Sequence, residues 1–495
     1  MVLVSATTSG SLVKKLLGIT SFANDQLITL FHTGLPGDQI GVFNVASAID
    51  GNIVSRKANE CDFCKRGSRL IRISGDQFLV ENPKHELLVI KKADFDKRRE
   101  SFFKQFAATN VLGWNTSVRN NDDSKEHFFI DVVQALRLSD AKHFSERLEK
   151  KLRRYLSRDL AIVITFNDQG SQELEQKVRE HLGSAAESIK WLTASSLKES
   201  ELEGAASVLV LAGAITSGRS LLAISRKLRG IHPSATITYF VPFAKLPNED
   251  AFKQLEKDLC QGGHSLVILY NSSVPRIKDH TKTAWDSERE ILKSYSDEDP
   301  LGEINSPLPN GLKDRQQRLV EQRYDSRSLF LPDHNGNELK LRSTFAFWSD
   351  LDFSECRLQN ATQADVYWTL QCVLHDLRNA SENNGLATAY HTTLISPANF
   401  DRYNDGVVQA CLLRAARPVE MDYRVDTVFS RQMTDVISSV VSNWSNAQGE
   451  AALEFLMALV TRRICLNDDH LKEIIALESE EMTDELKFLF KRLEK

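Results

Sequence analysis

The stretch VLVLAGAITSGRSL, residues 208–221, decides the fold of the middle of this 495-residue chain. Its apolar first half predicts a strand buried on both faces, and Leu221 begins a run of helix-spaced apolar residues. Between strand and helix, backbone N–H groups, hydroxyl groups and the positive end of the helix meet at one point, which favours a bound phosphate. Glycine lets the main chain approach the anion, and hydroxyl groups donate to it. The predicted phosphate-binding residues are Thr216, Ser217, Gly218, Arg219 and Ser220.

The sequence on either side repeats this alternation of strand and helix. Apolar runs predict strands at 160–166, 190–192, 207–211, 236–241 and 266–269. Helices are expected at 172–182, before Gly183, and from Leu221. Alternating elements of this kind indicate an α/β fold with a parallel sheet and helical crossovers.

Residues 155–270 resemble the type I phosphoribosyltransferases, in which an apolar strand, two acids and a Thr-Thr-Gly-x-Thr-Leu loop bind phosphoribosyl pyrophosphate. The apolar strand and TSGRSL, residues 216–221, match this pattern in place. The resemblance implies a phosphoribosyltransferase-like domain whose loop cradles the 5-phosphate. The family's two acids hold the ribose hydroxyls and help to position Mg²⁺, but Ala212 and Gly213 stand at their positions. We therefore expect no cofactor and no metal, with Mg²⁺ conceivable only through other carboxylates.

Two other interpretations of this segment stay open. A flavodoxin-like or other doubly wound sheet also places a Ser/Thr-rich loop at its switch point. The less favoured alternative is that the loop is a polar turn in which one Ser or Thr caps the helix. Capping needs only one such residue, whereas residues 216–220 hold three hydroxyl side chains around a glycine.

The remaining sequence predicts further domains on both sides. Residues 1–140 read as a mixed α/β N-terminal domain, and the phosphoribosyltransferase-like domain is expected at 141–275. Polar residues predominate at 276–345, which favours a linker or insertion, and 346–495 predict a helical C-terminal domain. This layout resembles phosphoribosyltransferase-like proteins of bacterial conflict and antiphage systems, including retron-associated ones. The resemblance rests on a C-terminal pattern of Asn404, Asp405, Gly406, Gln409 and Arg414.

Composition limits the compartment and the partners. The formal net charge of −5 leaves no general cationic field, so any contact with nucleic acid must be local. Seven scattered cysteines argue against a disulfide scaffold and for a reducing compartment, by default the cytoplasm. No apolar run reaches the length of a membrane span, so we expect no membrane partner. The expected partners are a phosphorylated nucleotide or sugar phosphate, and a protein bound through the helical domain.

Three further features have a structural and a functional interpretation. Cys61 and Cys64 have zinc-knuckle spacing, but His32 and His85 could complete a site only through the fold, so two plain thiols are favoured. In 395–406, Asp405 is favoured as a helix cap, although Arg402 and Arg414 could bind an anion. Arg463 and His470 lie near the spacing of HEPN ribonucleases, but a helix end explains them better.

Two functions follow, and the sequence leaves open whether the chain is an enzyme. The first is a regulatory or effector protein that grips a phosphorylated ligand without turning it over. The alternative is a divergent phosphoribosyltransferase or nucleotide N-glycosidase that depletes nucleotides as a toxin. Its catalytic carboxylates would be Asp168 or Glu173, from the loop and helix after the strand at 160–166.

Overall fold

The computed structural model describes most of the chain in two compact units, residues 1–83 and 84–495. The residues described are 2–7, 11–19, 26–33, 35, 39–45, 60–66, 72–74, 77–79, 84–96, 99–114, 128–138, 142–202, 205–273, 282–293, 308–321, 327–342, 346–348, 360–379 and 391–494. No described helix has the length and apolar character needed to cross a bilayer.

The first unit contains a small parallel sheet. Strands β1 (Val2–Thr7), β2 (Leu27–His32) and β3 (Ile40–Asn44) pair in that order, and helix α1 (Ser11–Ile19) follows β1. Val4, Val13 and Leu27 form its buried core. The unit also holds α3 (Asp62–Lys65) and the antiparallel pair of β4 (Arg72–Ser74) and β5 (Gln77–Leu79).

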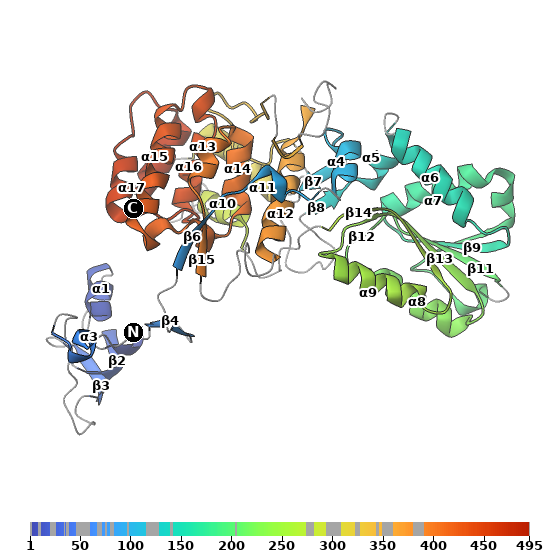
Figure 1. Ribbon diagram of the computed structural model, residues 1–495, viewed down its shortest axis with the longest axis horizontal. Coiled ribbons are helices and arrows are strands. Elements are labelled where there is room, and N and C mark those ends of the chain that lie inside the picture. The colour runs from blue at the N-terminus through green and yellow to red at the C-terminus, as the bar shows by residue number, and fades with distance from the viewer. Residues whose placement is uncertain are drawn as a thin grey trace. The chain divides into compact units, whose positions relative to one another are not determined.

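The second unit contains the parallel sheet that the sequence predicts (Figure 1). Its strands are β9 (Leu160–Thr165), β10 (Lys190–Thr193), β11 (Ser207–Leu211), β13 (Thr236–Ala244) and β14 (Ser265–Asn271), in the spatial order β10-β9-β11-β13-β14. A short strand, β12 (Ala214–Ile215), continues the course of β11 beside β13. All these pairs are parallel, so the mixed α/β class with a parallel sheet is confirmed.

Helices cover both faces of this sheet, because alternate strand residues point to opposite sides. On one face, α6 (Lys142–Tyr155) and α7 (Gln169–Leu182) pack on residues such as Val163 and Leu209. On the other, α8 (Arg219–Ile231) and α9 (Glu249–Cys260) pack on Ile164 and Val210. Figure 1 shows these two helical layers, with α6 and α7 on one side and α8 and α9 on the other. The inner strands β9, β11 and β13 are therefore largely buried on both faces, as their continuous apolar sequence predicts.

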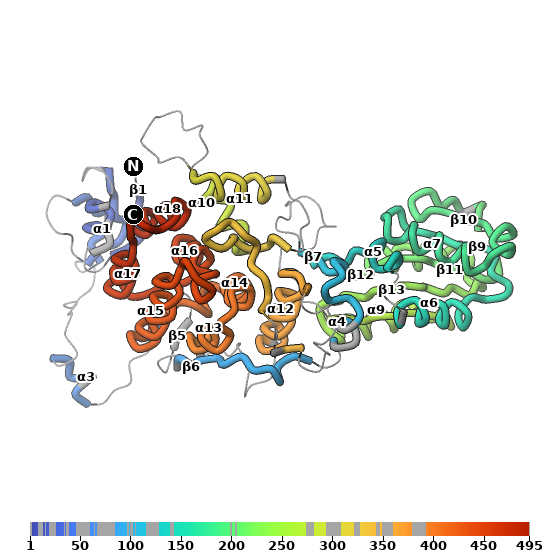
Figure 2. Tube along the Cα trace, turned by 90° about the horizontal axis from the view of Figure 1, so that it is seen from above, coloured from blue at the N-terminus to red at the C-terminus, as the bar shows by residue number. Residues whose placement is uncertain are grey.

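The rest of the second unit is largely helical. Residues 84–138, part of the expected N-terminal domain, belong to this unit and form β6 (Lys84–Leu88), α4 (Glu100–Phe106), β7 (Leu112–Trp114), β8 (Phe128–Ile130) and α5 (Val132–Arg137). Strand β6 pairs with β15 (His391–Ile395). The later helices are α12 (Gln363–Asn379), α13 (Ala398–Arg402), α14 (Gly406–Ala415), α15 (Thr427–Ser442), α16 (Ala452–Val460), α17 (Asp468–Ile475) and α18 (Asp484–Leu493). Figure 2 shows α14, α15 and α16 clustered together.

Two helices occupy the segment expected as a linker at 276–345. They are α10 (Ala284–Lys293) and α11 (Asn310–Glu321), which pack on each other. Trp285 and Leu312 are buried in the same core as the C-terminal helices. Part of the polar composition that suggested a linker comes from Glu288, a charged side chain that is buried in this core.

Candidate functional site

The strand order places a candidate site at the carboxyl ends of β9 and β11. Numbered along the chain, the five main strands have the order 2-1-3-4-5, in which the direction of winding reverses between β9 and β11. In doubly wound sheets, ligands bind in the crevice at this reversal. The two loops that meet there are the one from β9 to α7 and the one from β11 to α8.

The junction between β9 and α7 is closed by its own side chains. Asp168 caps α7: one carboxylate oxygen accepts from the Ser171 N–H at 2.9 Å, and the other accepts from the Ser171 hydroxyl at 2.6 Å. The Ser171 hydroxyl in turn accepts from the Gly213 N–H at 2.9 Å. A Cβ on Gly213 would lie 2.8 Å from the carbonyl carbon of Gly170. The two loops therefore touch directly and leave no space for a ligand at this point.

The junction between β11 and α8 has a different construction. The chain leaves β11 through Ala212 and Gly213, pairs again with β13 as β12, and begins α8 at Arg219. Gly218 stands at the N-cap with φ +69° and, having no side chain, makes no cap hydrogen bond itself. A Cβ on Gly218 would lie 2.5 Å from the Leu255 side chain of α9. Both the left-handed backbone and this close contact require glycine.

The residues around Gly218 present donors at the surface. Thr216 and Ser217 are half-buried, and Arg219 and Ser220 are exposed. The Ser217 hydroxyl lies 3.4 Å from the Arg219 N–H, which is a long contact. Within the described part of the chain, the Arg219 guanidinium has no hydrogen-bond or ion-pair partner. The first-turn amides, three hydroxyl groups and one unpaired cation lie within five residues of the chain here, a set of donors that suits an oxyanion.

The two predicted catalytic carboxylates are already engaged. Both oxygens of Asp168 accept from Ser171. Glu173, on α7, pairs with Arg137 of α5 at 2.6 Å. The hydrogen bond from Arg137 holds the pKa of Glu173 below its usual value, which makes this carboxylate a weak base. Catalytic roles for Asp168 and Glu173 stay predictions.

The other candidate residues lie away from this edge of the sheet. Asp405 caps α14, accepting from the N–H groups of Val407 and Val408, as favoured from the sequence. Arg402 is exposed. The Arg463 guanidinium donates to backbone carbonyls, including that of Leu413. The remaining site residues in this region also have internal partners: His470 contacts the Ser430 hydroxyl, and Gln409 donates to the Phe400 carbonyl.

The CxxC pair lies in the first unit. Cys61 precedes α3 and is half-buried. The side chain of Cys64 lies outside the described residues. Among the residues that the structure describes, no three His, Cys, Asp or Glu side chains gather as a metal site would need.

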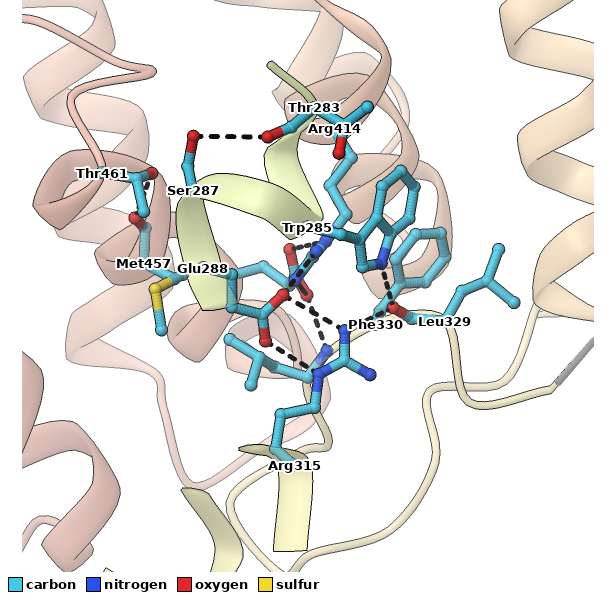
Figure 3. A network of polar contacts seen from close by, with 12 residues as sticks. Thr283, Trp285, Ser287, Glu288, Arg315, Leu329, Phe330, Arg414, Met457 and Thr461 are labelled. Carbon is cyan, nitrogen blue, oxygen red and sulfur yellow. Dashed lines mark hydrogen bonds and ion pairs between the residues drawn. The ribbon is translucent and has the colours of Figure 1, made fainter. Parts of the chain in front are cut away.

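Arg414 belongs to a buried charge network that sequence reasoning missed (Figure 3). It donates to Glu288 at 2.7 Å and to both carboxylate oxygens of Glu454 at 2.6 and 2.8 Å. Arg315 also donates to Glu288, at 2.8 Å. Burial alone would raise the pKa of Glu288, but the charges of Arg315 and Arg414 lower it to about 2. Every charge in the network has a partner, so Arg414 is not available to an external anion.

One sequence signal could have found this network. Trp285, Glu288 and Leu292 fall on one face of α10, at positions three and four residues apart. A glutamate between two large apolar residues on the same helical face predicts either an exposed face or a buried carboxylate with a cationic partner. The sequence does not identify which arginine supplies the partner.

In the comparisons with known proteins, no family model and no curated protein matches the chain.

Proposed function

We propose that the chain binds the phosphate of a phosphorylated nucleotide or sugar phosphate at residues 216–220. In this proposal the α/β domain is phosphoribosyltransferase-like, and the chain is a regulatory or effector component of a bacterial antiphage system. The observation that carries the phosphate site is the start of α8, where the N-cap residue Gly218 has no side chain to cap the first turn, the Ser217 hydroxyl makes only a long contact with the Arg219 N–H, and Arg219 stands exposed.

A comparison of neighbouring helices supports this assignment. Asp168 caps α7 and Asn248 caps α9, and each accepts from a first-turn N–H. Helix α8 starts instead with Gly218 in a left-handed conformation and no side-chain cap. The first N–H groups of a helix have no partner within it, so they need water or a ligand. An anion with several oxygens fits these N–H groups, the hydroxyls and Arg219 together.

Binding without turnover is favoured by what surrounds the loop. Ala212 and Gly213 bring no carboxylate to the ribose side of the proposed ligand, and both are buried. Asp168 is committed to the cap of α7. The alternative, a toxic transferase or N-glycosidase, requires Asp168 or Glu173 to leave its present partner.

Calorimetry tests the binding proposal directly. The ligands are inorganic phosphate, ribose 5-phosphate and a nucleoside monophosphate, titrated into the full chain. The test variant replaces Thr216, Ser217 and Ser220 together by alanine. The control variant replaces Thr193, Ser195 and Ser196, an equally polar trio after β10 whose hydroxyls bond to neighbouring side chains.

We expect the wild type and the control to bind at least one of these ligands, and the test variant to bind at least tenfold more weakly. Equal binding by both variants, or none by the folded wild type, would reject the phosphate site. For the alternative, loss of cellular nucleotides on expression that Asp168→Asn abolishes would favour an enzyme, and intact pools would count against it.

The protein-partner part of the proposal concerns the helical region. Val419, Val425 and Val428 are all exposed and lie within ten residues of chain at the start of α15. They lie in three successive elements, two short 3-10 turns and the first turn of α15, and we take this segment as the candidate contact with a protein partner. A plaque assay in a bacterial host that carries the gene in its natural genomic context tests the antiphage role. Protection by the wild type that the triple alanine variant of residues 216–220 loses would support it.

A further inference from the structure

Helix α6 has most of its basic side chains on one flank, which the order of residues along the chain does not show directly. Acids and bases alternate along residues 142–155, which is typical of a solvated face. Around the helix axis, however, four cations fall on one flank, at positions i, i+3, i+4 and i+7, and Arg158 follows three residues after the helix ends at Tyr155. We call this set the cationic stripe, and it consists of Arg147, Lys150, Lys151, Arg154 and Arg158.

The flanks of α6 face different neighbours. The Arg147 guanidinium lies 4.8 Å from the ring centre of Tyr270, on edge strand β14. The Glu149 carboxylate lies 2.9 Å from the His181 ring of α7, on the opposite flank. The Arg147 side of the helix therefore faces β14, the last strand of the sheet, and the α7 side carries Glu149.

In the described part of the chain, no acidic side chain neutralises the cationic stripe. None of its five residues makes an ion pair there, and Glu146, the other acid of the helix, pairs at 3.9 Å with His143. All of the stripe is exposed except Lys151, which is half-buried. Unpaired cations at this density repel one another, so an external polyanion would lower their free energy.

An aromatic ring lies within the cationic stripe. The Tyr155 ring is half-buried, with the Lys151 ammonium 5.2 Å and the Arg154 guanidinium 5.4 Å from its centre. The ring holds these two cations in place, and cations that can follow a phosphate backbone are one part of sites for single-stranded nucleic acid.

We propose that the cationic stripe on α6 binds single-stranded nucleic acid through its phosphates. An acidic protein is the other polyanion to consider, but protein interfaces need an apolar centre. Every fully exposed described residue of α6 is polar or charged. Phosphate contacts need no apolar centre, and the net charge of −5 over the whole chain makes a local cationic surface necessary for them. The site is separate from the α8 junction, so the two proposals succeed or fail independently.

The dimensions of the cationic stripe give an expected stoichiometry. The helical part of the cationic stripe, residues 147–154, spans about 10 Å at the helical rise of 1.5 Å per residue. We expect contacts to about four phosphates, and hence a slope of about −3 when the logarithm of the binding constant is plotted against that of the salt concentration.

The test uses a fluorescein-labelled 20-nucleotide oligo-dT and the full chain, with anisotropy measured from 50 to 200 mM NaCl. The test variant is Lys150→Glu with Arg154→Glu. The control variant is Lys253→Glu with Lys257→Glu, which has the same charge change and spacing on exposed positions of α9, on the other face of the sheet. Circular dichroism and thermal unfolding confirm that both variants fold.

The proposal predicts that wild type and control bind with a slope near −3, and that the test variant binds at least tenfold more weakly at 100 mM NaCl with a shallower slope. Equal loss in both variants would show a general charge effect and overturn the proposal. No binding by the wild type, or binding of poly-L-glutamate in preference to the oligonucleotide, would also overturn it, the latter in favour of an acidic protein.

Discussion

Arg219 and Arg414 are both arginines that the sequence offers as anion binders, and the structure places them in opposite surroundings. Arg219 is exposed at the first turn of α8, and no described residue pairs with its side chain. Arg414 is buried and donates to two carboxylates, those of Glu288 and Glu454. An arginine whose donors are already used by buried partners holds a fold together, whereas one with free donors beside uncapped amides can bind a ligand.

The difference predicts that changes around Arg414 affect stability, and changes around Arg219 affect binding. The largest effect is expected for Glu288→Gln, because it leaves Arg315 and Arg414 in the core without their shared countercharge. Removing one partner of a buried ion network typically costs about 3–5 kcal/mol. Urea denaturation followed by circular dichroism measures the loss.

Phosphate affinity is the control for this change. The Glu288→Gln protein that remains folded should bind phosphate as the wild type does, because the network lies outside the α8 junction. If Glu288→Gln leaves the free energy of unfolding unchanged, the buried ion pairs contribute little to stability. Arg414 would then not differ from Arg219 in its effect on stability.

Asp365 extends the comparison to a buried carboxylate that lacks an arginine. One of its oxygens accepts from the N–H groups of Ala108 and Thr362, and the other has no hydrogen bond. Burial raises its pKa to about 6, in spite of these hydrogen bonds. In Glu288, by contrast, two arginines bring the pKa down to about 2.

A raised pKa in the folded state means that the folded chain binds the proton more tightly than the unfolded chain does. The contribution of Asp365 to stability is therefore full below pH 4 and is lost as the pH rises to about 6, by up to about 3 kcal/mol. Asp365→Asn, which resembles the protonated acid, should match the wild type at pH 4 and exceed it at pH 7. Urea unfolding at both pH values measures this, and a constant difference between the two proteins would contradict it.

Gly218→Ala should affect both stability and binding. The new Cβ would overlap Leu255, and the backbone angle φ of +69° disfavours any residue with a Cβ. We expect a loss of about 1–3 kcal/mol in unfolding free energy and more than tenfold in phosphate affinity.

Gly230→Ala is the matched control in the same helix. Nothing lies within 4 Å of a Cβ at Gly230, so alanine there should be neutral or stabilising by up to about 1 kcal/mol. Calorimetry and thermal unfolding of both variants measure the contrast. Unchanged phosphate affinity in Gly218→Ala would remove the α8 junction from consideration as the site.

The sheet could be predicted from the sequence because its inner strands are continuous apolar runs. Residues 160–166 and 207–211 correspond to β9 and β11 within one residue, and the loop before α8 lies at the carboxyl end of an inner strand as expected. Helix α8 begins at Arg219, two residues before the expected Leu221, because Gly218 ends the loop. These features depend on local patterns of a few residues, which a sequence displays directly.

The partners of the charged residues could not be predicted in this way. Asp168 in a loop before a helix is compatible with catalysis and with capping, and only the position of Ser171 distinguishes them. Glu288 and Arg414 are 126 residues apart in the chain, so no local pattern links them. The burial of a charge depends on which helices pack together, and this information is long-range.

Asp168 tests whether the closed α7 junction takes part in ligand binding. Asp168→Ala removes the cap of α7 and should cost about 1 kcal/mol, whereas Asp168→Asn should retain most of the stability. Phosphate affinity should change less than twofold in both variants. A large loss of affinity in the folded Asp168→Asn variant would join the two junctions into one site and would revive the enzymatic alternative.

Arg219→Ala should have the smallest effect on stability and still weaken binding. Its side chain contacts no described partner, so removing it should change the unfolding free energy by less than about 0.5 kcal/mol. A charged hydrogen bond to phosphate is worth about 1.5–3 kcal/mol, which corresponds to at least a tenfold loss of affinity. Arg226→Ala, at an exposed position of the same helix, is the control and should bind as the wild type does. If the two alanine variants bind phosphate equally, Arg219 is a surface residue without a ligand, and the contrast with Arg414 concerns burial alone.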